Sequence, residues 1–588
     1  MKLFLTFALT FLLGMRTTFA MPEIMPLEKV QSGMNGVAYT VVDQSGAIEP
    51  FDVKIIGLMD NGKGSSKMIM AEASGSVIDK TGGVLQGMSG SPVYIDGKLV
   101  GALSAGIKEM NPRTFFITPI ENMLKIWDLP DIKEFAPPVQ LDEKTDETET
   151  DSEVPADEEK SAEEKSVMFF SGFDSSGLKF LEREMKPFGF ENFFVAAKSD
   201  TASQIKYNAT IKPGAAMGVA VVYGDFLVGA TGTVTAVDGN RILGFGHPFS
   251  HGGNVNYFMT DASVIAAVNG VIGNGMKISS VGNIIGRINQ DRESGVAGIL
   301  GNFPSTVPIN VTIKDETLDK TETYSANIAY NENLLPKLGA AIAYSAFNKT
   351  ADETAEATVA VDFGIKTNAV EDGNITRQNV FYSTADVGQQ AITELLQALT
   401  LVCSNTTEES AISGIDVNMT LNRERQTASL VSAFADKKRV KPGETVNLVI
   451  TLQPYRKPED VIVVPYTVPL NQKEGPLVLD LHGGALVPVV PANTNVVKPS
   501  TGTPKKIFDD KIKKLISANK NNQLIIELGA ASIPKTQKEI LENIKRAKKA
   551  QERFKKLGIK PPTPANNKVD TKYIIDNVIQ VTINVDKI

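Results

Sequence analysis

Alternating apolar and polar residues, broken by glycine-rich turns, dominate the chain on both sides of an acidic stretch near residue 150. Residues 92–103 are an example, because two stretches with a period of two flank the pair Asp96-Gly97. A period of two places alternate side chains on opposite faces of a strand, and Asp-Gly is a favoured hairpin turn. The pattern predicts β-hairpins and a mainly β fold up to about residue 335.

Helical and strand patterns mix in the second half. Residues 391–402 form a helix-like run, and residues 441–452 alternate in a way that is typical of a β-sandwich. Proline and asparagine crowd residues 488–504, which indicates a boundary. The run 540–557 has apolar residues on one side and lysine or arginine elsewhere. We expect a basic amphipathic helix that packs on its own domain, with contact to a membrane surface or cell wall as the alternative.

Residues 1–20 have the pattern of an export signal. Lys2 precedes the apolar run 3–13, and the segment ends in Thr-Phe-Ala at Ala20. We expect cleavage after Ala20 and export to the periplasm, the cell surface or the medium. The apolar run is shorter than the roughly 20 residues that a spanning helix needs, so no stable membrane span is expected.

Composition changes this picture little. The 588 residues include 60 Lys+Arg and 68 Asp+Glu, for a net charge of −8, with 42% hydrophobic residues. These values are ordinary for a globular protein of several domains and argue against nucleic-acid binding driven by overall charge. The acidity is local, because residues 141–165 contain twelve Asp or Glu and three Lys. Such a segment cannot form a core, and it predicts a disordered linker.

The only cysteine, Cys403, follows the helix-like run. One cysteine cannot form an internal disulfide, so burial and strand pairing must supply the stability. We expect Cys403 to be a buried small hydrophobic residue rather than a catalytic thiol.

The candidate nucleophile lies in residues 87–92, Gly-Met-Ser-Gly-Ser-Pro. A nucleophilic serine needs a turn of small residues that exposes its hydroxyl, with backbone N–H groups nearby to receive an oxyanion. This turn has that form, although a plain glycine-serine hairpin turn is the alternative.

A serine needs a base, and the chain has three histidines: His247, His251 and His482. His247 follows a predicted hairpin over residues 231–246 and lies between a glycine and a proline, where it can approach another loop closely. His251 is expected on a loop surface, and His482 lies far away in the chain. We therefore select His247.

Three other motifs are set aside. Residues 57–64 have the spacing of a phosphate-binding loop, but Gly64 replaces the hydroxyl residue that would hold magnesium. His247 and His251 are spaced like zinc ligands on a helix, yet Pro248 disfavours a helix there, so a zinc site remains only a weak alternative. The glycines at 273–282 lack the strand, helix and acid of a dinucleotide site. No cofactor or metal is expected.

Residues 87–92 resemble the Gly-Asp-Ser-Gly-Gly-Pro turn of chymotrypsin-like proteases. Residues 81–103 and 232–311 resemble two blocks of the SpoIVB family of serine peptidases, and the resemblance extends over about residues 34–311. It implies a chymotrypsin-like double β-barrel. It also implies that a protein or peptide is the substrate.

The resemblance assigns roles to single residues. Ser89 is the nucleophile, His247 is the general base and acid, and the amides of Gly87 and Ser89 form the oxyanion hole. In the family the histidine block precedes the serine block, whereas here it follows, an order that a permutation of the two halves would give. The family's triad acid lies fifteen residues before the serine, where this chain has Ser74. Ser74, or Asp261 as an alternative, is the candidate third member.

Together these features divide the chain. The predicted parts are a signal peptide (1–20), a serine half of the peptidase domain (21–138), an acidic linker (139–166), a histidine half (167–335), a mixed helix and strand module (336–425), a β-sandwich-like module (426–487) and a C-terminal module with the basic helix (488–588).

The expected function is that of an exported serine endopeptidase of the SpoIVB type. Because the triad acid is not identified, a second hypothesis is a non-catalytic exported protein that retains the fold and binds a cell-envelope partner. A zinc hydrolase that uses His247 and His251 is the third.

Overall fold

The computed structural model describes most of the chain. The described residues are 21–60, 67–106, 111–131, 168–188, 193–195, 211–269, 275–352, 356–486, 503–529 and 567–587, with a few single positions between 541 and 552. The predicted signal peptide and acidic linker, and most of the predicted basic helix, lie outside them. Within the described part, no helix is long and apolar enough to cross a membrane.

The N-terminal part is a closed six-stranded β-barrel. Its strands are β1 (Asn35–Thr40), β2 (Glu49–Asp60), β3 (Lys67–Ser74), β4 (Pro92–Ile95), β5 (Lys98–Gly106) and β6 (Thr114–Pro119), in the order β1-β2-β3-β6-β5-β4. Strand β2 shows why they form, because Phe51, Val53 and Ile55 are buried in the barrel while Asp52 and Lys54 are exposed. Period-two burial of β-branched and aromatic residues is typical of a barrel strand.

A second ring of six strands follows. Its members are β9 (Ala216–Gly224), β10 (Leu227–Asp238), β11 (Arg241–Gly244), β12 (Gly253–Val268), β13 (Met276–Arg292) and β14 (Gly295–Leu300). They pair in the order β9-β12-β13-β14-β11-β10, and pairing of β9 with β10 closes the ring. The mainly β fold with two barrels, expected from the sequence, is therefore confirmed.

The second barrel continues into a larger sheet. One side adds β16, β15, β19, β17 and β18, and the other adds β7 and β8. The bounds are β7 (Met168–Ser171), β8 (Phe193–Val195), β15 (Thr306–Asp315), β16 (Lys320–Ala329), β17 (Ala357–Thr367), β18 (Asn374–Ser383) and β19 (Ile412–Asn422). Among the helices that pack on this sheet are α3 (Ser175–Met185), α4 (Leu335–Ala351), α5 (Val387–Ala391) and α6 (Thr393–Cys403). The predicted boundary at 335/336 therefore divides a single core.

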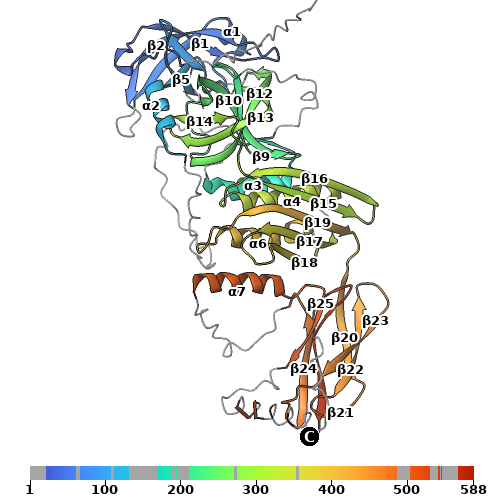
Figure 1. The fold of residues 1–588 in the computed structure, drawn as a ribbon. Coiled ribbons are helices and arrows are strands. Elements are labelled where there is room, and N and C mark those ends of the chain that lie inside the picture. The colour runs from blue at the N-terminus through green and yellow to red at the C-terminus, as the bar shows by residue number, and fades with distance from the viewer. Residues whose placement is uncertain are drawn as a thin grey trace, which may run out of the picture.

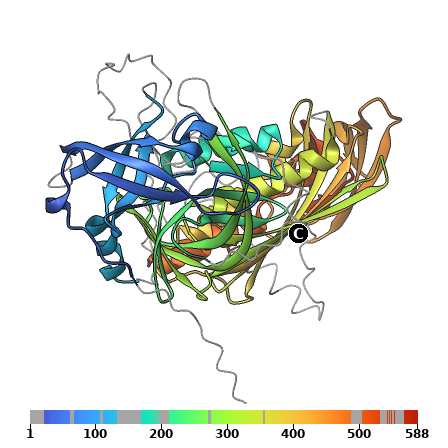
Figure 2. The ribbon, with the colours of Figure 1, turned by 90° about the horizontal axis from the view of Figure 1, so that it is seen from above.

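The C-terminal part consists of two sheets around one core. The first contains β20 (Thr427–Ala435), β22 (Thr445–Pro454), β23 (Asp460–Thr467) and β27 (Ile574–Ile575). The second contains β21 (Arg439–Val440), β24 (Gly475–Gly483), β25 (Gln523–Leu528), β26 (Lys568–Asp570) and β28 (Val578–Val585). Strands from both sides of the predicted boundary at residue 488 fill this core, so described strands of the last two predicted modules share one sandwich. Figures 1 and 2 place it at the far end of the molecule from the first barrel.

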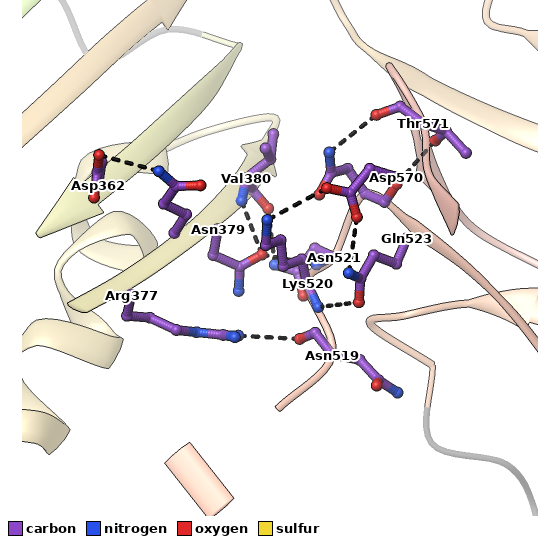
Figure 3. Close-up of polar contacts among 12 residues, drawn as sticks. Asp362, Arg377, Asn379, Val380, Asn519, Lys520, Asn521, Gln523, Asp570 and Thr571 are labelled. Carbon is purple, nitrogen blue, oxygen red and sulfur yellow. Dashed lines mark hydrogen bonds and ion pairs between the residues drawn. The ribbon is translucent and has the colours of Figure 1, made fainter. Parts of the chain in front are cut away.

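Hydrogen bonds attach the sandwich to the large sheet through the segment that follows helix α7 (Pro504–Ser517) in the chain. Arg377 of β18 donates to the carbonyl oxygens of Ala518 and Asn519 at 2.6 and 3.0 Å. The same guanidinium makes two hydrogen bonds of 2.9 Å to Glu394 of α6. Asn521 adds a hydrogen bond of 2.8 Å from its side chain to the carbonyl oxygen of Val380 (Figure 3). The buried Arg377 therefore links β18, α6 and the segment after α7 where the sandwich meets the large sheet.

Candidate active site

The serine turn, residues 85–91, connects helix α1 (Ser76–Thr81) to strand β4 of the first barrel. Gly87 and Gly90 have φ angles of +90° and +93°, in the region that favours glycine. Position 90 requires glycine for a second reason, because a Cβ there would stand 1.9 Å from the carbonyl oxygen of Thr233. The local sequence thus permits a tight turn that touches the second barrel.

The two serines of the turn have different environments. Ser91 is fully buried, and its hydroxyl donates to the carbonyl oxygen of Met88 at 2.6 Å. Ser89 is half-buried, and its hydroxyl has no hydrogen-bond partner in the described part of the chain. The Ser91 hydroxyl is therefore occupied in holding the turn, while that of Ser89 is free to react.

Two backbone amides of the turn, those of Gly87 and Ser89, have no acceptor among the residues that the structure describes. The amides of Met88 and Gly90, which alternate with them, donate to carbonyl oxygens at 3.0 and 2.7 Å. Buried backbone N–H groups are nearly always paired within the protein, but Gly87 and Ser89 are half-buried, so their amides are open to solvent or to a bound group. Two open amides at and just before a serine are the arrangement that an oxyanion hole requires.

The turn is docked on strand β10 of the second barrel. The Thr233 amide donates to the carbonyl oxygen of Ser89 at 2.8 Å, and the Thr235 hydroxyl donates to that of Gly90, also at 2.8 Å. The two barrels also share a buried apolar cluster, which contains Leu99 and Ile120 from the first and Leu243 from the second. The two barrels therefore meet at the serine turn.

His247 lies in a second turn, directly after β11. Phe245 and Gly246 before it both have positive φ angles, of +67° and +72°. The carbonyl oxygen of Gly246 accepts a hydrogen bond of 2.6 Å from the Thr118 hydroxyl of the first barrel. Gly90 of the serine turn packs against the backbone of Phe245. The structure thus brings together the two turns that sequence analysis selected, although they come from different barrels.

The ring of His247 is held by its neighbour in the chain. Its Nδ1 lies 2.8 Å from the carbonyl oxygen of Pro248. A carbonyl oxygen only accepts, so in the neutral ring Nδ1 carries the proton and Nε2 has the free electron pair. Burial lowers the pKa of His247, and the Pro248 carbonyl and the charge of Asp291 oppose this shift. Within the described residues, no hydrogen bond joins this ring to Ser89.

Asp291 was not singled out as a site residue by the sequence. It is fully buried at the end of β13, and its carboxylate accepts the amides of Phe249, Ser250 and Gly252 at 2.7–3.0 Å. It also accepts the Ser250 hydroxyl at 2.8 Å. This carboxylate organises the loop that follows His247, and its charge favours the protonated ring. The available signal was an acidic residue at the end of a strand in the histidine block.

The predicted third members lie elsewhere. Ser74 is exposed at the end of β3, paired with Asp52 of the neighbouring strand. Asp261 is buried in β12, where its carboxylate accepts the Asn283 amide at 2.6 Å, and burial raises its pKa. Neither side chain hydrogen-bonds to His247, so an assignment of either as the orienting group stays a prediction.

The other candidates have ordinary environments. His251 is exposed with its Nδ1 3.5 Å from Glu293, and His482 is buried in the sandwich. Across the described residues, no group of three or more His, Cys, Asp or Glu is arranged to hold a metal ion. Cys403 is buried at the end of α6, and this burial raises the pKa of its thiol well above the usual range.

A comparison with protein families finds a match over the first barrel. Residues 16–124 match the family model of SpoIVB peptidase S55. This range includes the complete first barrel and Ser89, and it ends before His247. The resemblance to SpoIVB-type serine peptidases is confirmed for this part of the chain. No curated protein and no solved structure matches the chain.

Proposed function

We propose that the chain is an exported serine endopeptidase that hydrolyses peptide bonds through an acyl-enzyme at Ser89. The observation that carries the proposal is the pair of open amides at Gly87 and Ser89, next to the unpartnered serine hydroxyl, within the described part of the chain. Both residues are half-buried, so the two amides are open to a carbonyl oxygen that enters from solvent beside the Ser89 hydroxyl. The match of residues 16–124 to a serine peptidase family supports the same reading.

The chemistry follows from the proposed roles. Ser89 Oγ attacks the scissile carbonyl carbon while its proton passes to Nε2 of His247. The carbonyl oxygen becomes an oxyanion that accepts hydrogen bonds from the Gly87 and Ser89 amides. Collapse breaks the C–N bond, and His247 gives its proton to the leaving amine. Water then hydrolyses the ester by the same steps, with His247 again as base, and frees Ser89.

The environment of His247 suits a general base. Lowering of its pKa by burial keeps the ring neutral at physiological pH, and the contact with Pro248 leaves Nε2 unprotonated. Asp291 supplies the negative charge that stabilises the imidazolium formed during the reaction. The proposal requires a hydrogen bond between Ser89 and His247 in the substrate complex, and such contacts are often long in the free enzyme.

A non-catalytic binding protein is the second candidate. It is favoured by the contact of Nδ1 with a backbone carbonyl in place of a carboxylate. A carbonyl oxygen fixes the tautomer, but it stabilises the imidazolium less than a charged partner does. Export through residues 1–20, and contact of the segment 540–557 with the cell envelope, belong to either proposal.

A fluorophosphonate probe distinguishes the two candidates. It reacts with a serine only where a base and an oxyanion hole activate the hydroxyl. We expect stoichiometric labelling of the purified chain lacking residues 1–20, mapped to Ser89 by peptide mass spectrometry. Ser89→Ala should abolish it, whereas the matched variant Ser91→Ala, which removes only the hydroxyl bonded to the Met88 carbonyl, should only weaken it. Absence of labelling, or labelling at another serine, would contradict the peptidase proposal and favour the non-catalytic binding protein.

A further inference from the structure

The peptide group between Gln86 and Gly87 is anchored on strand β13. The Gln86 carbonyl oxygen accepts the backbone amide of Lys277 at 2.9 Å, and the Gln86 amide donates to Gly275 at 2.9 Å. In a trans peptide the C=O and N–H bonds point in opposite directions. Because the carbonyl faces β13, the Gly87 amide must face away from it, which is the orientation that an oxyanion donor needs.

Two further peptide groups of the turn, between Gly87 and Met88 and between Ser89 and Gly90, are anchored on strand β10. The Thr233 hydroxyl donates to the carbonyl oxygen of Gly87 at 3.2 Å, and the Thr233 amide donates to that of Ser89 at 2.8 Å. One residue of the second barrel therefore holds the carbonyl groups of both residues whose amides are proposed to bind the oxyanion. These two peptides lie on either side of the Met88–Ser89 peptide, which carries the Ser89 amide, so the turn cannot change its course there without breaking a bond to Thr233.

The side chain of Lys277 contacts both Gly87 and Thr233. Its side chain is buried, and Gly87 packs on its methylene groups, since a Cβ at Gly87 would stand 3.1 Å from Cε and 3.3 Å from Cβ of Lys277. Its Nζ lies 3.4 Å from the hydroxyls of Thr233 and Thr40. Lys277 Nζ, charged or neutral, can donate a hydrogen bond to Thr233 Oγ1. This oxygen then acts as an acceptor toward Lys277, and its own proton is available for the hydrogen bond to the Gly87 carbonyl oxygen.

We propose that Thr233 and Lys277 are positioning residues that keep the Gly87 amide turned into the oxyanion hole. The inference rests on the proposed function of the Ser89 turn and deepens it. Both donors of the hole belong to the first barrel, but the bond that orients the Gly87 amide comes from the second. Peptidase chemistry then depends on correct docking of the two barrels and not on the serine turn alone.

The test compares isosteric variants in the chain lacking residues 1–20. Thr233→Val keeps the backbone bond to Ser89 and removes only the hydroxyl, whereas Thr233→Ser retains it. Thr40→Val is the matched control, because it removes the other hydroxyl that contacts Lys277, and this hydroxyl makes no hydrogen bond to the serine turn in the described part of the chain. For each, we measure the second-order rate of labelling by a fluorophosphonate, kcat and KM for an unfolded protein substrate, and the melting temperature.

We expect Thr233→Val and Lys277→Met to lower kcat and the labelling rate about 10- to 100-fold with little change in KM, because a misplaced oxyanion donor weakens only the transition state. Thr233→Ser should recover most of the rate, and Thr40→Val should retain it. If Thr233→Val labels as fast as the wild type, or changes only KM or the melting temperature, the positioning role is wrong.

The test also separates this inference from the proposed function. Labelling of the wild-type chain at Ser89, with undiminished labelling of Thr233→Val, overturns the positioning role alone. Failure of the wild-type chain to label overturns the proposed function, and the positioning role with it. If Lys277→Met does not fold, the comparison of Thr233→Val with Thr233→Ser still tests the positioning role.

Discussion

Gly90 of the first barrel lies so close to Phe245 of the second that a Cβ on Gly90 would stand 2.5 Å from the Phe245 amide nitrogen. This contact joins the turn of the proposed nucleophile to the turn of the proposed base. It exists only because position 90 has no side chain, and both turns depend on it for their relative position.

Gly90→Ala is therefore expected to separate the two turns. The new methyl group also meets the Thr233 carbonyl oxygen, so the barrels must move apart, and we expect a loss of labelling at Ser89 of about 100-fold or more. Gly97→Ala is the control, because Gly97 also has a positive φ, of +73°, but a Cβ there would meet no atom of the described chain within 4 Å. Equal effects of the two substitutions on labelling would show that backbone strain, and not the inter-barrel contact, is responsible.

The second prediction concerns the cooperation of Ser89 and His247. Ser89→Ala and His247→Ala should each abolish turnover of an unfolded protein, and the double variant should lose little more, because groups that act as one unit are not additive. Turnover and melting curves are measured together. If the losses multiply in the double variant, the two residues do not form one catalytic unit.

The third prediction concerns Asp291 and pH. A general base works when neutral, so kcat/KM should fall as the pH drops through the His247 pKa, which burial places below its ordinary value of 6.5. Asp291→Asn removes a charge that raises this pKa, so the acid limb of the pH profile should shift to still lower pH. It also places an amide against several N–H donors, and we expect a loss of about 2 kcal/mol of stability.

Ser250→Ala serves as the control for Asp291→Asn. It removes one hydrogen bond to the carboxylate but leaves the charge in place. The acid limb should then keep its wild-type position. An acid limb that does not respond to Asp291→Asn would show that the titrating group is not His247.

The sequence predicted the parts of this molecule that depend on local signals. The hairpin around Asp96-Gly97 and the serine turn with Gly87 and Gly90 are specified by residues that lie next to each other, so their form could be derived from pattern and turn chemistry. His247 was selected from three histidines by its neighbours alone. The structure places its turn beside that of Ser89.

The remainder depends on contacts between distant segments. Asp291, Thr233 and Lys277 sit in strands whose composition does not reveal which loop will dock on them. The same holds for domain boundaries, because the strands before and after α4 join one sheet and β27 and β28 return to pair with the sandwich. Periodicity identifies a strand but not its partner.

The fourth prediction concerns the attachment of the sandwich. Arg377→Met removes the charged partner of Glu394 and the donors to Ala518 and Asn519, so we expect a loss of about 3 kcal/mol of stability and faster proteolysis near residue 518. Lys505→Met is the control, because its ion pair with Glu408 is exposed and should contribute little. Labelling at Ser89 should be unchanged in both variants. Similar proteolysis of the two variants would contradict the role of Arg377.

The last prediction concerns Lys277 and stability. Burial lowers the pKa of Lys277 to about 7 from 10.5, and the described groups that contact its amine, Thr40 and Thr233, carry no charge. Between these two pKa values the unfolded chain binds a proton that the folded chain lacks, so this residue makes stability rise with pH by up to about 1.4 kcal/mol per unit. Below pH 7 both states bind the proton, and the contribution becomes constant.

Lys277→Met removes this dependence. The variant should melt at a higher temperature than the wild type at pH 7, because an apolar side chain replaces a buried amine, and the difference should shrink steadily towards pH 10. The other titrating groups are common to both proteins and cancel in the comparison. Its catalytic rate should nevertheless be lower, as expected where a functional group is kept at a cost in stability. A pH-independent difference between the two melting curves would contradict the buried, weakly basic state of Lys277.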